Sequence, residues 1–328
     1  MKRRSILTLT GGSALGVVLP AMGQPEPVAH VGQLGNRPAS EPNNVAFHKV
    51  VADLMKLMGW EMGRNLVWHY KSGLTNLRQQ ITNAKELVAE KVDVILASNS
   101  EATAAAFEVT KSIPIVMLGA AAVELGYAKS LARPGGNITG MVYQSLDFSG
   151  KELELLLALQ PSLKKIGFSE SLELPEVGMY FKNWQNFAAA NGVTMVLLPN
   201  VLTLADIEPL LAAAKREGVQ ALVIGGVRYF LVGAGLQRIQ EWATANKVLT
   251  YGGTWQPGQL LAGFGPDGSE IIPVLCRQID RILRGAKPAD IPIEQPKRFN
   301  LIINQKIAKA IGLKIPQSVL LRATQVLD

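Results

Sequence analysis

The sequence contains few of the residues that carry most enzyme chemistry. Its 328 residues include one cysteine, Cys276, and three histidines, His30, His48 and His69. A single cysteine excludes a disulfide within the chain, and no histidine stands at metal-ligand spacing from another histidine, a cysteine or a carboxylate. A Gly-x-Ser-x-Gly motif and a phosphate-binding loop are also missing. The composition therefore predicts no catalytic residue, no metal site and no cofactor, and we do not expect an enzyme.

Dense charge runs and long hydrophobic runs are missing as well. The net charge is +7, but three of the 33 basic residues are Lys2, Arg3 and Arg4; the other 30 face 26 acidic residues and are scattered. This distribution argues against a nucleic-acid partner. The apolar segment from Ile6 to Leu19 is too short and too rich in glycine to span a bilayer well.

The N-terminus has the pattern of an export signal. The basic residues are followed by the apolar segment and by Ala21-Met22-Gly23, which predicts a signal peptide over residues 1–23 with cleavage before Gln24. Arg3-Arg4-Ser5-Ile6-Leu7 resembles a twin-arginine signal, and a general secretory signal fits equally well. With no cysteine near the cleavage point to carry a lipid, the mature protein is expected in a bacterial periplasm. An uncleaved N-terminal membrane anchor is the alternative.

Strand and helix patterns alternate along the chain. Apolar runs typical of strands covered on both faces are separated by segments with apolar residues at helical spacing. This order implies right-handed crossovers and parallel sheets. The predicted strands are Val28–Leu34, Asn65–Tyr70, Val92–Ala97, Ile113–Leu118, Ile138–Tyr143, Lys165–Ser169, Thr194–Leu198, Ala221–Ile224, Val248–Tyr251, Leu260–Phe264 and Phe299–Asn304.

The turn at Pro134-Gly135-Gly136 divides two such series, because proline fixes φ and the glycines allow positive φ. We interpret it as the join between two lobes, so that the fold class is α/β with two doubly wound parallel-sheet lobes. Crossings between the lobes are predicted near Tyr143, Trp255 and Pro292, which makes a three-crossing hinge. Lobe I then comprises residues 24–142 plus 256–292, and lobe II residues 143–255 plus 293–328.

Polar and aromatic residues follow several predicted strands, at the edge where open α/β sheets bind ligands. Ser98 to Ser100 opens a helix whose free amide groups suit a carboxylate. The same residues with Glu101 also fit a plain capping box, as do Ser149 to Glu152. The candidate ligand-binding residues are Gln33, Asn36, Ser98, Asn99, Ser100 and Gly119 in lobe I, and Arg228, Tyr229, Thr254 and Trp255 in lobe II.

Several segments carry a resemblance to a known family. From about Val28 to its end the chain resembles the uncharacterised ABC-transporter substrate-binding protein family, some relatives of which are associated with aromatic amino-acid uptake. The resemblance implies a type I periplasmic-binding-protein fold, two lobes around a cleft. The matching segments are Val92–Ile95, Ile113–Val116, Leu131–Gly140, Arg284–Pro292, Glu294–Pro296, Asn304–Lys306 and Ala310–Pro316.

The chain departs from the family pattern at two places on the expected cleft edge. Ser169-Glu170-Ser171 stands where relatives often have an Asn-Pro pair, and Gly225-Gly226-Val227 stands where they often have an Asp. Because these positions face the expected ligand, the departures affect the prediction of the ligand and not the prediction of the fold.

Our hypothesis from the sequence is a periplasmic solute-binding protein of an ABC importer. It would bind a small organic ligand, an amino acid or an aromatic or aliphatic carboxylate, and present its closed form to an ABC permease in the inner membrane. A ligand-sensing module that reports to a signalling partner is one alternative. An α/β hydrolase-type enzyme is another, although no clustered nucleophile and base can be assembled for it.

Overall fold

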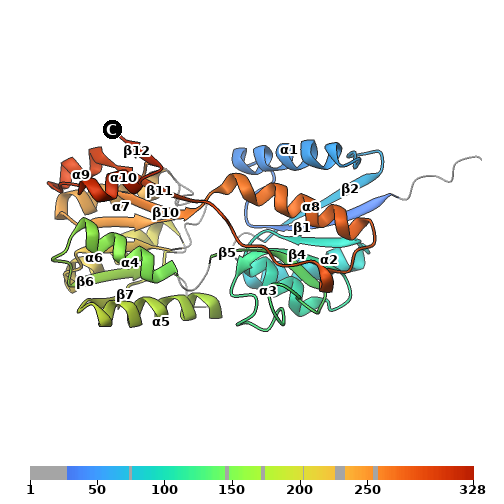
Figure 1. The fold of residues 1–328 in the computed structure, drawn as a ribbon, viewed down its shortest axis with the longest axis horizontal. Coiled ribbons are helices and arrows are strands. Elements are labelled where there is room, and N and C mark those ends of the chain that lie inside the picture. Colours follow the sequence, from blue (N-terminus) through green and yellow to red (C-terminus); the bar gives the residue numbers. More distant parts are fainter. Residues whose placement is uncertain are drawn as a thin grey trace, which may run out of the picture.

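The computed structural model describes residues 28–73, 76–144, 148–170, 174–201, 203–225, 233–253 and 258–328. Figure 1 shows two α/β lobes that lie side by side and are joined by extended segments. One lobe contains a five-stranded sheet of order β2-β1-β3-β4-β5, and the other a seven-stranded sheet of order β12-β11-β10-β9-β8-β6-β7. The predicted α/β class with two lobes is therefore confirmed.

The sheet of lobe I is parallel throughout. Its strands alternate between two cores, with Val94 and Leu96 packed on one face and Ile95 and Ala97 on the other, as expected for a strand covered on both sides. The strands are β1 (Ala29–Gly35), β2 (Leu66–Ser72), β3 (Val94–Ala97), β4 (Ile115–Ala120) and β5 (Ile138–Gln144). Helices α1 (Pro42–Leu57) and α8 (Ile271–Leu283) cover one face, and α2 (Leu77–Ala89) and α3 (Ser100–Val109) cover the other.

Lobe II has the same layered plan. Its strands are β6 (Lys165–Ser169), β7 (Thr194–Leu197), β8 (Ala221–Ile224), β9 (Leu249–Gly252), β10 (Ala262–Pro266), β11 (Phe299–Asn304) and β12 (Gln325–Leu327). Helices α4 (Phe148–Leu159) and α5 (Pro175–Ala190) pack on one face, and α6 (Ile207–Glu217) and α7 (Ala234–Asn246) on the other; α9 (Gln305–Ile311) and α10 (Gln317–Arg322) follow β11.

One strand pair of lobe II departs from the predicted parallel arrangement. β10 and β11 are antiparallel. β10 ends where the chain leaves lobe II, and β11 begins where it returns, so two neighbouring strands at the hinge must run in opposite directions. β10 also pairs with β9 in the second sheet, and the prediction that residues 256–292 all belong to lobe I is wrong for this strand.

The chain crosses between the lobes three times. The first crossing lies between Gln144 and Phe148 and the third between Glu294 and Phe299, close to the predicted places. The second lies after Pro266, before α8, and not near Trp255 as predicted. The pattern of Leu260–Phe264 indicates a strand, but it does not tell which sheet the strand joins.

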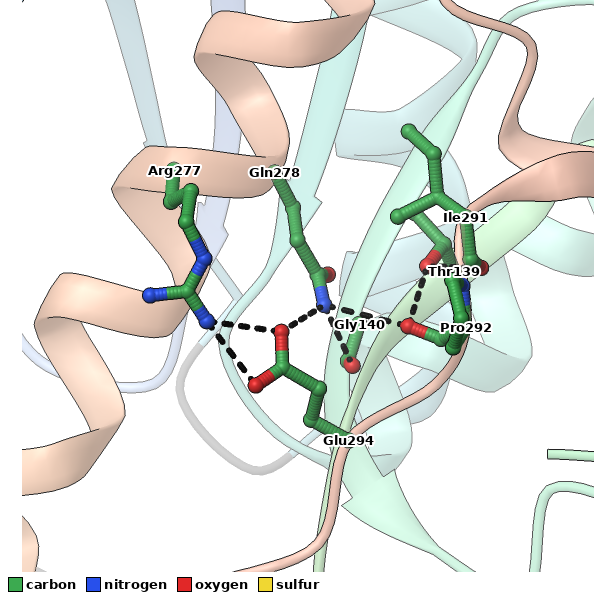
Figure 2. A network of polar contacts seen from close by, with 7 residues as sticks. All are labelled: Thr139, Gly140, Arg277, Gln278, Ile291, Pro292 and Glu294. Carbon is green, nitrogen blue, oxygen red and sulfur yellow. Dashed lines mark hydrogen bonds and ion pairs between the residues drawn. The ribbon is translucent and has the colours of Figure 1, made fainter. Parts of the chain in front are cut away.

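A polar cluster on α8 holds the first and third crossings together on the side of lobe I (Figure 2). Arg277 Nη2 donates to both carboxylate oxygens of Glu294 at 2.8 Å. Gln278, 1% exposed, donates to Glu294 Oε1 at 3.2 Å and to the carbonyl oxygens of Gly140 at 3.0 Å and Pro292 at 3.3 Å. The two crossings are therefore anchored to α8 where they leave lobe I.

In the part of the chain that the structure describes, no helix combines the length and the apolar character that crossing a membrane requires.

Candidate ligand-binding cleft

A cavity of about 470 Å³ lies between the lobes. Its lobe I wall is formed by residues that follow β1 and β3 and by parts of α1 and α8, and its lobe II wall by residues that follow β6, β8 and β9 and by the first turns of α4 and α5. Five of the predicted ligand-binding residues line it: Gln33, Asn36, Ser98, Asn99 and Ser100. Their contact with a ligand remains a prediction.

The lobe I wall is an ordered chain of amide and hydroxyl groups. Trp68 Nε1 donates to Gln33 Oε1 at 2.8 Å, and Gln33 Nε2 donates to Ser98 Oγ at 3.0 Å. Gln33 is only 2% exposed. Both ends of its amide are therefore fixed within the protein, and it orients Ser98 more than it faces the cavity. Ser98 keeps its own hydroxyl hydrogen for a ligand.

Asn99 is the N-cap of α3. Its Oδ1 accepts the backbone N–H of Ala102 at 2.7 Å, so the predicted capping box that starts at Ser98 is wrong by one residue. This bond turns the Nδ2 group of Asn99 the other way, and Nδ2 has no hydrogen-bond partner among the described residues. Asn99 is 9% exposed and lines the cavity. A buried donor without a partner costs free energy, which an acceptor on a ligand would recover.

The other predicted residues are placed differently. Asn36 is half-buried at the cavity wall. Gly119 is buried under the first turn of α3: a Cβ there would lie 3.7 Å from Ser100 Oγ and 3.0 Å from Met117 Cε, and its neighbours in β4 line the cavity in its place. Arg228, Tyr229, Thr254 and Trp255 lie outside the described residues.

The lobe II wall contains a buried carboxyl group. Glu152, on the first turns of α4, is 7% exposed, and its two oxygens accept the hydroxyl groups of Tyr180 and Tyr251, the latter at 2.8 Å. The predicted capping role of Glu152 is therefore wrong, because α5 and β9 supply its partners. Burial raises the pKa of Glu152 to about 7, although both hydroxyl bonds act in the opposite direction.

Two further carboxylates face the cavity from lobe II. Glu170 follows β6, and Glu176 lies in the first turn of α5. Burial, with the added field of Glu176, raises the pKa of Tyr127 in lobe I to about 12. Burial raises the pKa of Tyr143 as well, and Glu170 adds to the effect. The carboxylates of lobe II therefore act on tyrosines across the cleft.

Sequence reasoning placed Glu170 at the cleft edge but missed the rest of this wall. Glu152, Glu176 and Tyr251 are buried at the cavity, yet none directly follows the end of a strand where polar residues were sought. One signal was present for Glu152: it is a charged residue between apolar positions of a helix that packs on a sheet. A charge at such a position is rarely buried without a partner.

Neither a metal site nor a reactive thiol is found among the described residues of the cleft. Among the described residues, no group of histidines, cysteines and carboxylates has the arrangement of a metal site. Cys276 is buried in lobe I, and burial raises the pKa of its thiol to about 12, which suits core packing rather than a nucleophile.

Two α/β lobes joined by three crossings around a cleft define the type I periplasmic-binding-protein fold. Solved structures share this architecture. An ABC domain in complex with L-Trp from Streptococcus pneumonia superposes with a TM-score of 0.79 at 24% identity over 92% of this chain and 100% of that chain. The ligand-free, open structure of a substrate-binding protein with adhesive properties from Clostridium difficile gives 0.63 at 22% identity over 92% and 99%.

Sequence comparison gives the family. A tyrosine-binding protein of Clostridioides difficile (strain R20291) is 25% identical over 289 residues, which are 87% of this chain and 80% of the relative. The ABC transporter substrate binding protein family matches residues 38–327, and the chain belongs to this family. The predicted resemblance is confirmed, and the family is one of substrate-binding proteins, not of enzymes.

Proposed function

We propose that this protein is the exported solute-binding component of an ABC importer. It binds a small organic ligand, an amino acid or an aromatic or aliphatic carboxylate, between its lobes, and its closed form is recognised by a permease in the inner membrane. The observation that carries the proposal is the cavity of about 470 Å³ between two lobes on a three-crossing hinge. A volume of this order suits one small organic molecule.

Closure follows from the position of the site. Because each lobe contributes one wall, a ligand can contact both only when the lobes approach, and its binding free energy then favours the closed state. The L-Trp complex and the tyrosine-binding relative support an amino acid as the ligand. An export signal over residues 1–23 completes the proposal; these residues lie outside the described part of the chain.

Thermal-shift screening tests the proposal. The mature protein is melted with amino acids and small acids, and with sugars and nucleosides for comparison. A ligand at 100 times its Kd should stabilise the protein by about 2.7 kcal/mol. Small-angle X-ray scattering should then show a smaller radius of gyration with the ligand. The proposed ligand class would be contradicted if a sugar or nucleoside raised the melting temperature and no acid or amino acid did.

A further inference from the structure

The charges around the cleft are strongly unbalanced. Among the described lining residues, four are glutamates, at positions 101, 152, 170 and 176, and one is an arginine, Arg37. Arg37 is already engaged, because its Nη1 lies 3.3 Å from Glu41 Oε2. A ligand that brings only a negative charge would enter a site whose surrounding carboxylates repel it.

Glu176 is the carboxylate most available to a ligand. It is 6% exposed and lines the cavity, and no side chain or backbone group among the described residues donates a hydrogen bond to it. Its place in the first turn of α5 favours a negative charge through the helix dipole. Its oxygens are not among the buried side-chain atoms that lack a partner, so the carboxylate is accessible from the cavity, where a cationic donor of a ligand can reach it.

Glu152 can serve the same ligand. Its oxygens each accept one tyrosine hydroxyl, which fills two of about four acceptor positions of a carboxylate. Its partners are Tyr180 from α5 and Tyr251 from β9, and Glu170 and Glu176 line the same wall of the cavity. Among the described residues at this wall there is no basic side chain to neutralise it.

The wall opposite provides an independent observation. Asn99, 9% exposed, lines the cavity, and its Nδ2 donor is buried and has no partner among the described residues. The site therefore holds an unpaired donor in lobe I and an unpaired acceptor in lobe II. These two groups require a ligand with an acceptor at one end and a donor at the other.

We infer that the ligand carries a protonated amine, and that Glu176 on the wall of lobe II pairs with it. Glu170 adds to the negative field, and Asn99 on lobe I receives the acceptor end of the ligand. This inference rests on the proposed function and narrows it, because a plain aromatic or aliphatic carboxylate offers nothing to Glu176.

Matched ligand triads test the inference. Each triad keeps one side chain and consists of an amino acid, the amine without its carboxylate and the acid without its amine, such as phenylalanine, phenethylamine and 3-phenylpropanoate; a leucine triad supplies an aliphatic set. Calorimetric titration of the mature protein should detect only compounds that contain an amine. Glu176→Gln should weaken their binding roughly 10- to 100-fold, as expected for loss of a charged hydrogen-bond partner.

Two controls accompany the titration. Glu108→Gln, an exposed glutamate of α3 that does not line the cavity, should leave affinity unchanged. Ligand-free Glu176→Gln should melt close to the wild type, because the substitution breaks no hydrogen bond among the described residues. The inference would be overturned if the acid without its amine bound and the amine without its carboxylate did not, or if Glu176→Gln left the affinity for amines unchanged. Either result would leave the proposed solute-binding function intact. If no compound of any charge in a wide library bound, both the solute-binding function and the inference would be contradicted.

Discussion

The two walls of the cleft differ in chemistry although the two lobes share one plan. The wall of lobe I carries no net charge: Gln33, Ser98 and Asn99 are amides and a hydroxyl held by bonds within lobe I, and its two charged residues, Arg37 and Glu101, are of opposite sign. The wall of lobe II is acidic: Glu152 and Glu176 are buried there beside tyrosines. A ligand with unlike ends is therefore bound best when both walls reach it, and this asymmetry links recognition to closure.

The largest expected effect concerns the acidic wall and pH. The pKa of Glu152 is raised from its usual 4.5 to about 7, so the folded protein keeps a proton that the unfolded chain releases between these values. This carboxyl therefore stabilises the fold most below pH 4.5, and the contribution is lost as pH rises to about 7, by roughly 3 kcal/mol in all.

Glu152→Gln removes this titration and should isolate it. The difference in free energy of unfolding between variant and wild type should shift in favour of the variant from pH 4.5 to 7.5, as measured by urea denaturation at several pH values. A difference that stays constant with pH would show that Glu152 does not titrate in this range, and the acidic wall would lose its most distinctive member.

Next in size is the support of that carboxyl group. Tyr251→Phe removes the hydroxyl that donates to Glu152 Oε1 at 2.8 Å and should cost about 1–3 kcal/mol of stability at pH 8. Chemical denaturation measures it, with Tyr127→Phe in lobe I as the matched change. Equal costs for the two variants would indicate that the Glu152 bond contributes nothing of its own.

On the neutral wall, Asn99 has two separable roles. Asn99→Ala should cost about 1 kcal/mol, the usual value of an N-cap, because Ala102 N–H loses its acceptor. Asn99→Asp keeps an acceptor and should retain most of the stability, but it lacks the Nδ2 donor and should weaken ligand binding. Thermal melts with and without ligand separate the two, and an Asp variant with full affinity would refute the donor role.

The smallest effect is expected at Ser98. Ser98→Ala breaks only the bond from Gln33 Nε2 at 3.0 Å and should cost about 0.5–1.5 kcal/mol. Thermal melts of this variant and of Asn99→Ala compare the loss of stability at the two sites. A loss at Ser98 that exceeds the loss at Asn99 would mean that the Trp68–Gln33–Ser98 chain holds the neutral wall more strongly than the helix cap does.

The comparison of the walls also shows how far the sequence could lead. The neutral wall was predictable because Gln33, Ser98 and Asn99 lie at or directly after the ends of apolar strands, where local pattern and sheet topology suffice. The acidic wall was not, because Glu152 and Glu176 reach the cavity from helices whose placement depends on the hinge. The assignment of β10 failed for a similar reason: periodicity identifies a strand but does not name its neighbours.

A crystal structure with a bound ligand tests the central claim most directly. The account predicts closed lobes, a ligand nitrogen within hydrogen-bond distance of a Glu176 carboxylate oxygen, and a ligand oxygen within reach of Asn99 Nδ2. A ligand outside the cavity between the lobes, or one that turns a carboxylate toward Glu176 and its amine toward Asn99, would contradict it.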